Sequence, residues 1–164
     1  MKLTVVTIPP YACAYVVTLL VAVLADRSRF RGPYAAGASL LAFVAFIVQA
    51  TAAPDAFSLR YGMLCLATIG VFATLPPLAA WVGSNVRTTI AASLGIALNN
   101  GIGGLGQIVG VYIYKSEEAK IGYPTGHYTN AALQLVAVLL CCFLMWFYNR
   151  RNKSLQPGQV KWEI

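Results

Sequence analysis

Side chains that could support acid–base, nucleophilic or metal chemistry are few, and no carboxylate lies deep within a long apolar run. These groups are Asp26, Asp55, Glu117, Glu118, Glu163 and the one histidine, His127. The four cysteines occur without a C-x-x-C spacing. A proton relay inside a membrane needs buried ionisable residues, and a zinc site needs clustered Cys, His or carboxylate ligands. The sequence therefore predicts no enzyme activity, no catalytic residues, no metal site and no cofactor.

The elements that must position the remaining polar groups are long and apolar. Of the 164 residues, 59% are hydrophobic and 10% are charged, and the mean hydropathy is +0.68, whereas soluble domains are about 25% charged. Runs of the ~20 apolar residues that a membrane-spanning helix needs cover 3–24, 34–53, 56–81, 88–114 and 128–148. We expect an all-α integral membrane protein, with a five-helix bundle over 1–148 and a polar tail over 149–164.

Lysine and arginine are distributed unevenly between the two sides of this predicted bundle. The formal net charge is +7, but clusters of basic residues between apolar runs indicate membrane orientation rather than nucleic-acid binding. Eight basic residues lie in 25–33, 82–87 and the tail, against four on the other side. This bias places the C-terminus in the cytoplasm and the N-terminus outside. Because 3–24 does not resemble a cleaved signal peptide, we expect further helices before Met1.

Polar and small side chains separate the spans into two kinds. The spans 34–53 and 128–148 are almost uniformly apolar, which is typical of helices that face lipid. The span 88–114 is the least lipid-like, and its Asn100 and Gln107 share one helical stripe. These two side chains either form hydrogen bonds between helices or line a water-filled substrate path. A neighbouring small-residue stripe predicts close helix packing, and its glycines are Gly95, Gly103, Gly106 and Gly110.

The connector after the first span carries a recognisable pattern. Leu24-Ala25-Asp26-Arg27, followed by Arg29, Arg31 and Gly32, resembles the cytoplasmic loop signature of the major facilitator superfamily. In that superfamily the pattern recurs between helices eight and nine. The resemblance implies that Asp26 binds the start of a helix in the N-terminal half of a carrier, which this chain does not include.

Later segments resemble one family within that superfamily, the fungal anion:cation symporters, which include allantoate, nicotinate, pantothenate and biotin permeases. The segments similar to its tenth helix are Arg60-Tyr61, Gly70 and Pro77-x-x-x-Trp81-x-x-x-Asn85. Those similar to its eleventh helix and outer loop are the glycine-rich span, Ile113-Tyr114 and Tyr123-Pro124-Thr125-Gly126-His127. The resemblance covers essentially the whole chain and implies helices eight to twelve of a twelve-helix carrier.

The implied function is that of the C-terminal part of a proton-coupled permease that moves a small organic anion or vitamin-like carboxylate by alternating access. The implied cavity-lining candidates are Tyr11, Tyr15, Tyr61, Asn100 and Gln107. The implied inner-gate residues are Asp26, Arg27, Arg31 and Arg87. Arg60 either extends to the interface or captures an anionic substrate.

The expected partners are the lipid bilayer, the anionic substrate, and the missing N-terminal helices or a second chain, but no nucleic acid. The expected location is the plasma membrane. One alternative function remains, that of a non-transporting membrane protein or degenerate fragment that packs with other helices through its glycine-rich face.

Overall fold

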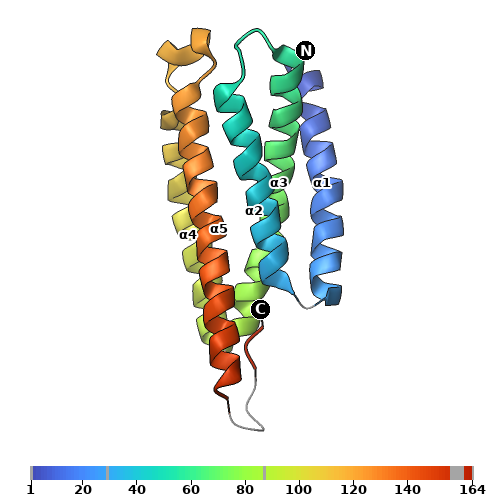
Figure 1. Ribbon diagram of the computed structural model, residues 1–164, viewed down its shortest axis with the longest axis vertical. Helices are drawn as coiled ribbons and strands as arrows, with labels where there is room; N and C mark the ends of the chain where they lie inside the picture. The colour runs from blue at the N-terminus through green and yellow to red at the C-terminus, as the bar shows by residue number, and fades with distance from the viewer. Residues whose placement is uncertain (1, 29, 87, 156–160, 164) are drawn as a thin grey trace.

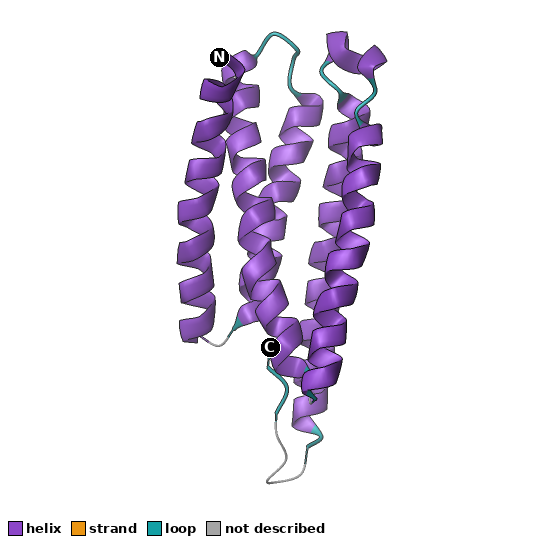
Figure 2. Ribbon diagram, turned by 180° about the vertical axis from the view of Figure 1, so that it is seen from behind, coloured by secondary structure: helices purple, strands orange, loops and turns teal. Residues whose placement is uncertain are grey.

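The computed structural model describes residues 2–28, 30–86, 88–155 and 161–163, with side chains described from residue 8 onward except at residue 100. This part of the chain is helical, without strands (Figure 2). The elements are α1 (Lys2–Ser28), α2 (Arg31–Thr51), α3 (Phe57–Asn85), α4 (Thr89–Ile113), a 3-10 helix η1 (Ser116–Ile121) and α5 (Pro124–Lys153). The expected spans all fall on these helices, and several helices extend beyond the apolar runs.

The five α-helices stand side by side with α2 near the centre (Figure 1). Extensive contacts join α2 to α3 and α5, and α3 also packs against α1. By contrast, α4 makes few contacts with α3 and α5. We call the end of the bundle that holds the C-terminus the tail end, and the end that holds η1 the opposite end.

The closest helix packing occurs between α2 and α3, where small residues meet. A Cβ atom on Gly70 would lie 2.7 Å from the Ala42 backbone nitrogen and 2.8 Å from the Ala38 carbonyl oxygen. One turn away, the hydroxyl groups of Ser39 and Thr74 are 3.2 Å apart and share a buried hydrogen bond. Small residues allow this approach, which packing and hydrogen bonds stabilise where lipid supplies no hydrophobic driving force.

The expectation that the span 34–53 faces lipid is wrong for one side of α2. Ala35 and Ser39 are fully buried, and Gln49 is 4% exposed. On the other side Leu40 and Val44 are exposed. Composition could not separate these two faces, because alanine is as compatible with a neighbouring helix as with lipid tails.

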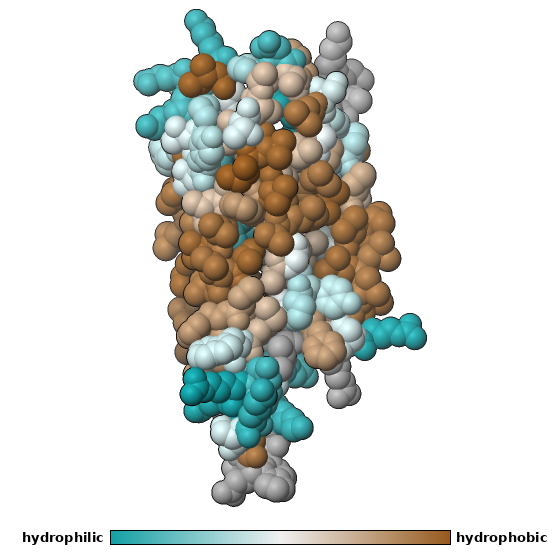
Figure 3. Space-filling model, viewed as in Figure 1, coloured by the Kyte–Doolittle hydropathy of each residue, from teal (hydrophilic) through white to brown (hydrophobic). Residues whose placement is uncertain are grey.

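All five α-helices are long and apolar enough to cross a membrane, judged by length and composition. The space-filling view shows hydrophobic side chains gathered in the middle of the visible face and hydrophilic ones gathered toward its two ends (Figure 3). This distribution matches a bilayer, whose hydrocarbon core is about 30 Å thick between polar headgroup layers. The fold is therefore that of an all-α membrane-spanning bundle.

Helix ends are capped by local side chains. The Thr88 hydroxyl accepts a hydrogen bond from the backbone amide of Ala91 at the start of α4, as expected for an N-cap threonine. At the start of α5, the Glu118 carboxylate accepts hydrogen bonds from the Thr125 backbone amide and hydroxyl. A carboxylate stabilises the positive end of a helix dipole. These caps set where α4 and α5 begin.

Candidate functional site

Two of the predicted cavity-lining residues lie together on α1. Tyr11 and Tyr15 are one turn apart and are 58% and 67% exposed. With Ala14, Thr18 and Phe72 of α3 they line a hollow of about 250 Å³. The Tyr11 and Phe72 rings meet edge to face with their centroids 5.9 Å apart. The hollow is thus mostly aromatic, and its polar groups come from α1.

Thr18 is the residue of this hollow whose polar group is unsatisfied. Its Oγ1 atom is buried and has no hydrogen-bond partner among the described residues. Other helical threonines, such as Thr68 and Thr129, donate to the carbonyl oxygen four residues earlier at 2.8 Å. An unpaired buried hydroxyl costs about 1–3 kcal/mol.

Tyr61 and Gln107 do not join this hollow. Tyr61 is half-buried near the start of α3, and by helix geometry it lies roughly 16 Å along the axis from Phe72. Gln107 is exposed on α4. The side chain of Asn100 lies outside the described residues. The five predicted lining residues are therefore not gathered into one pocket within this chain.

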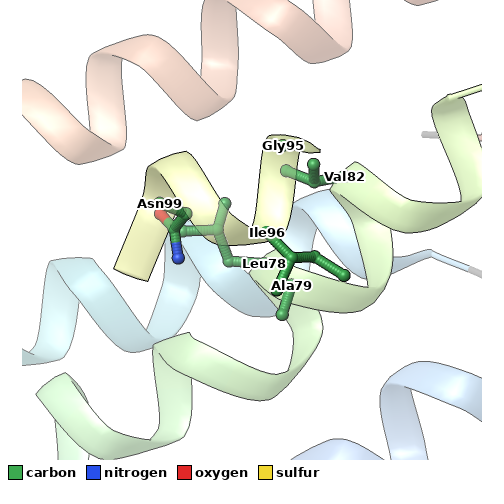
Figure 4. A pocket seen from close by; sticks show the side chains of 6 residues that line it. All are labelled: Leu78, Ala79, Val82, Gly95, Ile96 and Asn99. Atoms are coloured by element: carbon green, nitrogen blue, oxygen red, sulfur yellow. The ribbon is translucent and has the colours of Figure 1, made fainter. Parts of the chain in front are cut away.

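A second, smaller hollow of about 50 Å³ lies between α3 and α4. It lies where α3 and α4 cross, as the close-up shows (Figure 4). The lining residues are Leu78, Ala79, Val82, Gly95, Ile96 and Asn99. A Cβ atom on Gly95 would contact Val82 at 3.6 Å. Asn99, which the sequence analysis did not select, supplies the polar side chain of this hollow.

The other glycines of the predicted packing stripe meet no packing partner in the part of the chain that the structure describes. A Cβ atom on Gly103, Gly106 or Gly110 would meet nothing within 4 Å among the described residues. Helix packing through this stripe therefore stays a prediction, and its partner would have to come from outside the described chain. A close approach of two helix backbones occurs instead at Gly70, between α2 and α3.

The predicted inner-gate residues that the structure describes, Asp26, Arg27 and Arg31, lie at the tail end, and two of them meet. The Asp26 Oδ1 atom accepts from Arg31 Nη2 at 3.0 Å and from Arg31 Nε at 3.2 Å. Asp26, expected to pair with an absent helix, thus forms an ion pair within the chain. Arg27 is exposed, and Arg87 lies outside the described residues.

Arg31 has further acceptors, which sequence reasoning did not identify. Its Nη1 atom donates to the carbonyl oxygen of Ala80 at 3.1 Å and to Glu163 Oε2 at 3.0 Å. Its guanidinium group therefore joins the end of α1, the end of α3 and the C-terminal tail. No local signal could reveal the Glu163 contact, because 132 residues separate the two partners.

At the opposite end, Arg60 is engaged with the loop before α5. Its Nη2 atom donates to the carbonyl oxygen of Gly122, a glycine with φ of +84°. Arg60, Asp55 and Lys120 contribute charged side chains to an open cleft of about 560 Å³. Arg60 is half-buried beside this cleft, and both of its expected roles, extension to the interface and capture of an anionic substrate, stay predictions.

The segment with the Tyr-x-x-Gly-His pattern, expected as an outer loop, forms the N-cap and first turn of α5 and packs around Tyr114. The Asn130 side-chain amide donates to the Tyr114 hydroxyl at 2.9 Å, and that hydroxyl lies 3.5 Å from Nδ1 of His127. Because an amide nitrogen only donates, the Tyr114 proton can point toward His127. A Cβ atom on Gly126 would lie 2.7 Å from the Tyr114 ring. The glycine therefore makes room for the ring.

Nearly the whole chain aligns with fungal transporters. It is 46% identical over 149 residues to the MFS transporter prlL of a fungus (strain NRRL 50135), covering 90% of this chain and 30% of that protein. It is 29% identical over 161 residues to the MFS-type transporter cnsO of Penicillium expansum, covering 96% and 31%. These homologues support membership of the major facilitator superfamily.

A third relative is also named as a transporter. An uncharacterized transporter of Schizosaccharomyces pombe is 21% identical over 150 residues, covering 92% of this chain and 30% of that protein. The chain thus spans about 30% of the length of the curated relatives that it matches. No family model matches the chain, and no solved structure matches it.

Proposed function

We propose that the chain is the C-terminal part of a secondary active transporter of the anion:cation symporter type. In this proposal it moves a small organic anion or vitamin-like carboxylate across the plasma membrane by alternating access, coupled to protons. The observation that carries the proposal is the alignment of 90% of the chain with a transporter at 46% identity. The bundle, domain 1–148, spans the bilayer, and 149–164 form the cytoplasmic tail.

The distribution of charge supports this orientation. Among the described residues the tail end carries Arg27, Arg31, Arg150, Arg151, Lys153 and Lys161. Basic residues near span ends are enriched on the cytoplasmic side of membranes. In this orientation Asp26, Arg27, Arg31 and Arg87 belong to the inner gate, as the sequence pattern predicts.

The hollow between α1 and α3 is the part of the described chain best suited to contact substrate. Its aromatic rings would stack on a flat organic ring, and the unpaired Thr18 hydroxyl would donate to a substrate oxygen. Tyr61, Asn100 and Gln107 would line the same substrate path at other depths in the membrane. The exposed glycine stripe of α4 would pack against a helix of the missing part.

Uptake by the intact protein tests this function. Proteoliposomes containing it would be given a panel of radiolabelled small carboxylates, with and without an inward proton gradient. We expect one class of carboxylate to accumulate and a protonophore to abolish the accumulation. No uptake across the panel would contradict the proposal and favour the non-transporting alternative.

Thr18→Val tests the role of the hollow. Valine keeps the shape of threonine and removes the hydroxyl, and one lost hydrogen bond corresponds to a KM about 5-fold higher. The same variant should be at least as stable as the parent, because it removes an unsatisfied polar atom. Thr129→Val is the matched control, since that hydroxyl binds a carbonyl of its own helix. An unchanged KM for Thr18→Val would remove Thr18 from the substrate path.

A further inference from the structure

The C-terminal segment Lys161–Glu163, which we call the strap, returns to the tail end of the bundle and binds three helices. Figure 1 shows the C-terminus beside the end of α3. The Trp162 ring stacks on Tyr148 of α5 with centroids 5.5 Å apart and planes 6° apart. The Glu163 carboxylate pairs with Arg31 of α2 at 3.0 Å. The strap therefore spans α2, α3 and α5.

Two asparagine side chains hold the strap by its backbone. Asn152 accepts from the Trp162 amide and donates to the Trp162 carbonyl, both at 2.8 Å. Asn85 accepts from the Glu163 amide at 2.9 Å and donates to the Glu163 carbonyl at 3.1 Å. Each side-chain amide thus satisfies both backbone groups of one strap residue, as a neighbouring strand would.

Trp81 and Asn85 of α3 bind the strap together. The two residues are four apart on α3, so they share one face of the helix. Trp81 Nε1 donates to the same Glu163 carbonyl oxygen at 2.9 Å. Trp81 is 2% exposed and also meets the Tyr148 ring edge to face. Trp81 and Asn85, whose spacing the sequence showed, therefore form the surface on which the strap binds.

Arg31 connects this binding site to the predicted gate. Its guanidinium group contacts Asp26 and Glu163 together, so one side chain carries both the loop ion pair and the strap ion pair. Loss of one carboxylate contact lets the guanidinium group move and changes the electrostatic field at the other carboxylate. Docking of the strap and the arrangement of the gate loop are coupled through this shared arginine.

We propose that the strap is a releasable latch that holds the tail end of the bundle closed. Docked, it ties the ends of α2, α3 and α5 together and keeps Arg31 turned toward the bundle. Released, it frees Arg31 and the ends of these helices for the rearrangement that opens this end of the transporter. The latch rests on the proposed alternating-access function.

Hydrogen exchange of the intact protein in detergent measures docking directly. The Trp162 and Glu163 amides should be protected in the parent protein because both donate to asparagine side chains. Glu163→Gln, which keeps the shape and removes the charge, should speed exchange of these amides about 5- to 10-fold, as expected for loss of a charge-assisted contact. Trp162→Ala should have a similar effect. Lys161→Ala is the control, since that side chain is exposed.

Thiol labelling measures opening of the tail end without any substrate. Val82→Cys, in a background with Cys13, Cys65, Cys141 and Cys142 replaced by alanine, places a reporter in the hollow between α3 and α4. A membrane-impermeant maleimide applied from the tail side should label it several-fold faster when Glu163→Gln or Trp162→Ala is added. Lys161→Ala should leave the labelling rate unchanged.

Two results would overturn the latch. Unprotected strap amides in the parent protein would show that the strap does not dock. Faster exchange without faster labelling would show that the strap docks but does not control opening. Failure of uptake would instead contradict the transporter function. Hydrogen exchange and thiol labelling need no substrate, so both can still be interpreted in that case.

Discussion

Replacing Gly70 with alanine tests whether α2 and α3 touch at the backbone. The new methyl group would lie 2.7 Å from the Ala42 nitrogen and 2.8 Å from the Ala38 oxygen. Neither atom can move without its helix, so the two helices must separate. Overpacking of this kind costs about 1–3 kcal/mol. Separation would also lengthen the nearby Ser39–Thr74 hydrogen bond, and interhelical bonds in membranes contribute about 0.6 kcal/mol on average.

We therefore expect Gly70→Ala to lower the free energy of unfolding by about 2–4 kcal/mol. The assay is an SDS unfolding titration of the purified chain in mild detergent, followed by tryptophan fluorescence. Gly62→Ala is the matched control on the same helix, because a Cβ atom there meets nothing within 4 Å. Equal stability of the two variants would refute the close approach of α2 and α3.

Two smaller effects follow from other described contacts. A double-mutant cycle of Ser39→Ala and Thr74→Ala should give a coupling free energy of about 0.6–1.7 kcal/mol in the same unfolding titration, and a value near zero would mean that the hydroxyl groups do not interact. Gly126→Ala should destabilise the first turn of α5 and the loop that precedes it by about 1–3 kcal/mol, because its methyl group would overlap the Tyr114 ring. Limited proteolysis of that loop measures this effect, and unchanged cleavage would show that the ring has room to move.

Sequence reasoning predicted the helices well because length and apolar composition suffice to specify a membrane span. It also selected Asp26 and Arg31, which the structure brings together, and the Trp81–Asn85 spacing. It named Gly70 as part of the family resemblance but not as a packing residue, although a glycine between apolar residues is a common signal of close packing. The glycine-rich span drew attention to α4 instead, where the described glycines other than Gly95 face open space.

The candidate cavity-lining residues show a second limit of prediction from sequence. Composition showed that α1 carries polar side chains, but it could not separate Thr18 from threonines such as Thr68. That difference depends on whether a hydroxyl finds a carbonyl acceptor, which is a matter of side-chain rotation in the folded bundle. Tyr11 and Tyr15 were both cavity candidates implied by the resemblance, and their spacing of four residues places them on one face of α1.

The sequence by itself determined that the chain forms apolar helices of membrane-spanning length and that its carboxylates lie near helix ends or in connectors. These properties depend on residue type and local order, so they can be read along the chain. Only the tertiary structure decided which faces are covered and what the tail does. Glu163 reaches Arg31 across 132 residues and Asn85 across 78. Such contacts arise when packing brings helix ends together, and no local pattern encodes them.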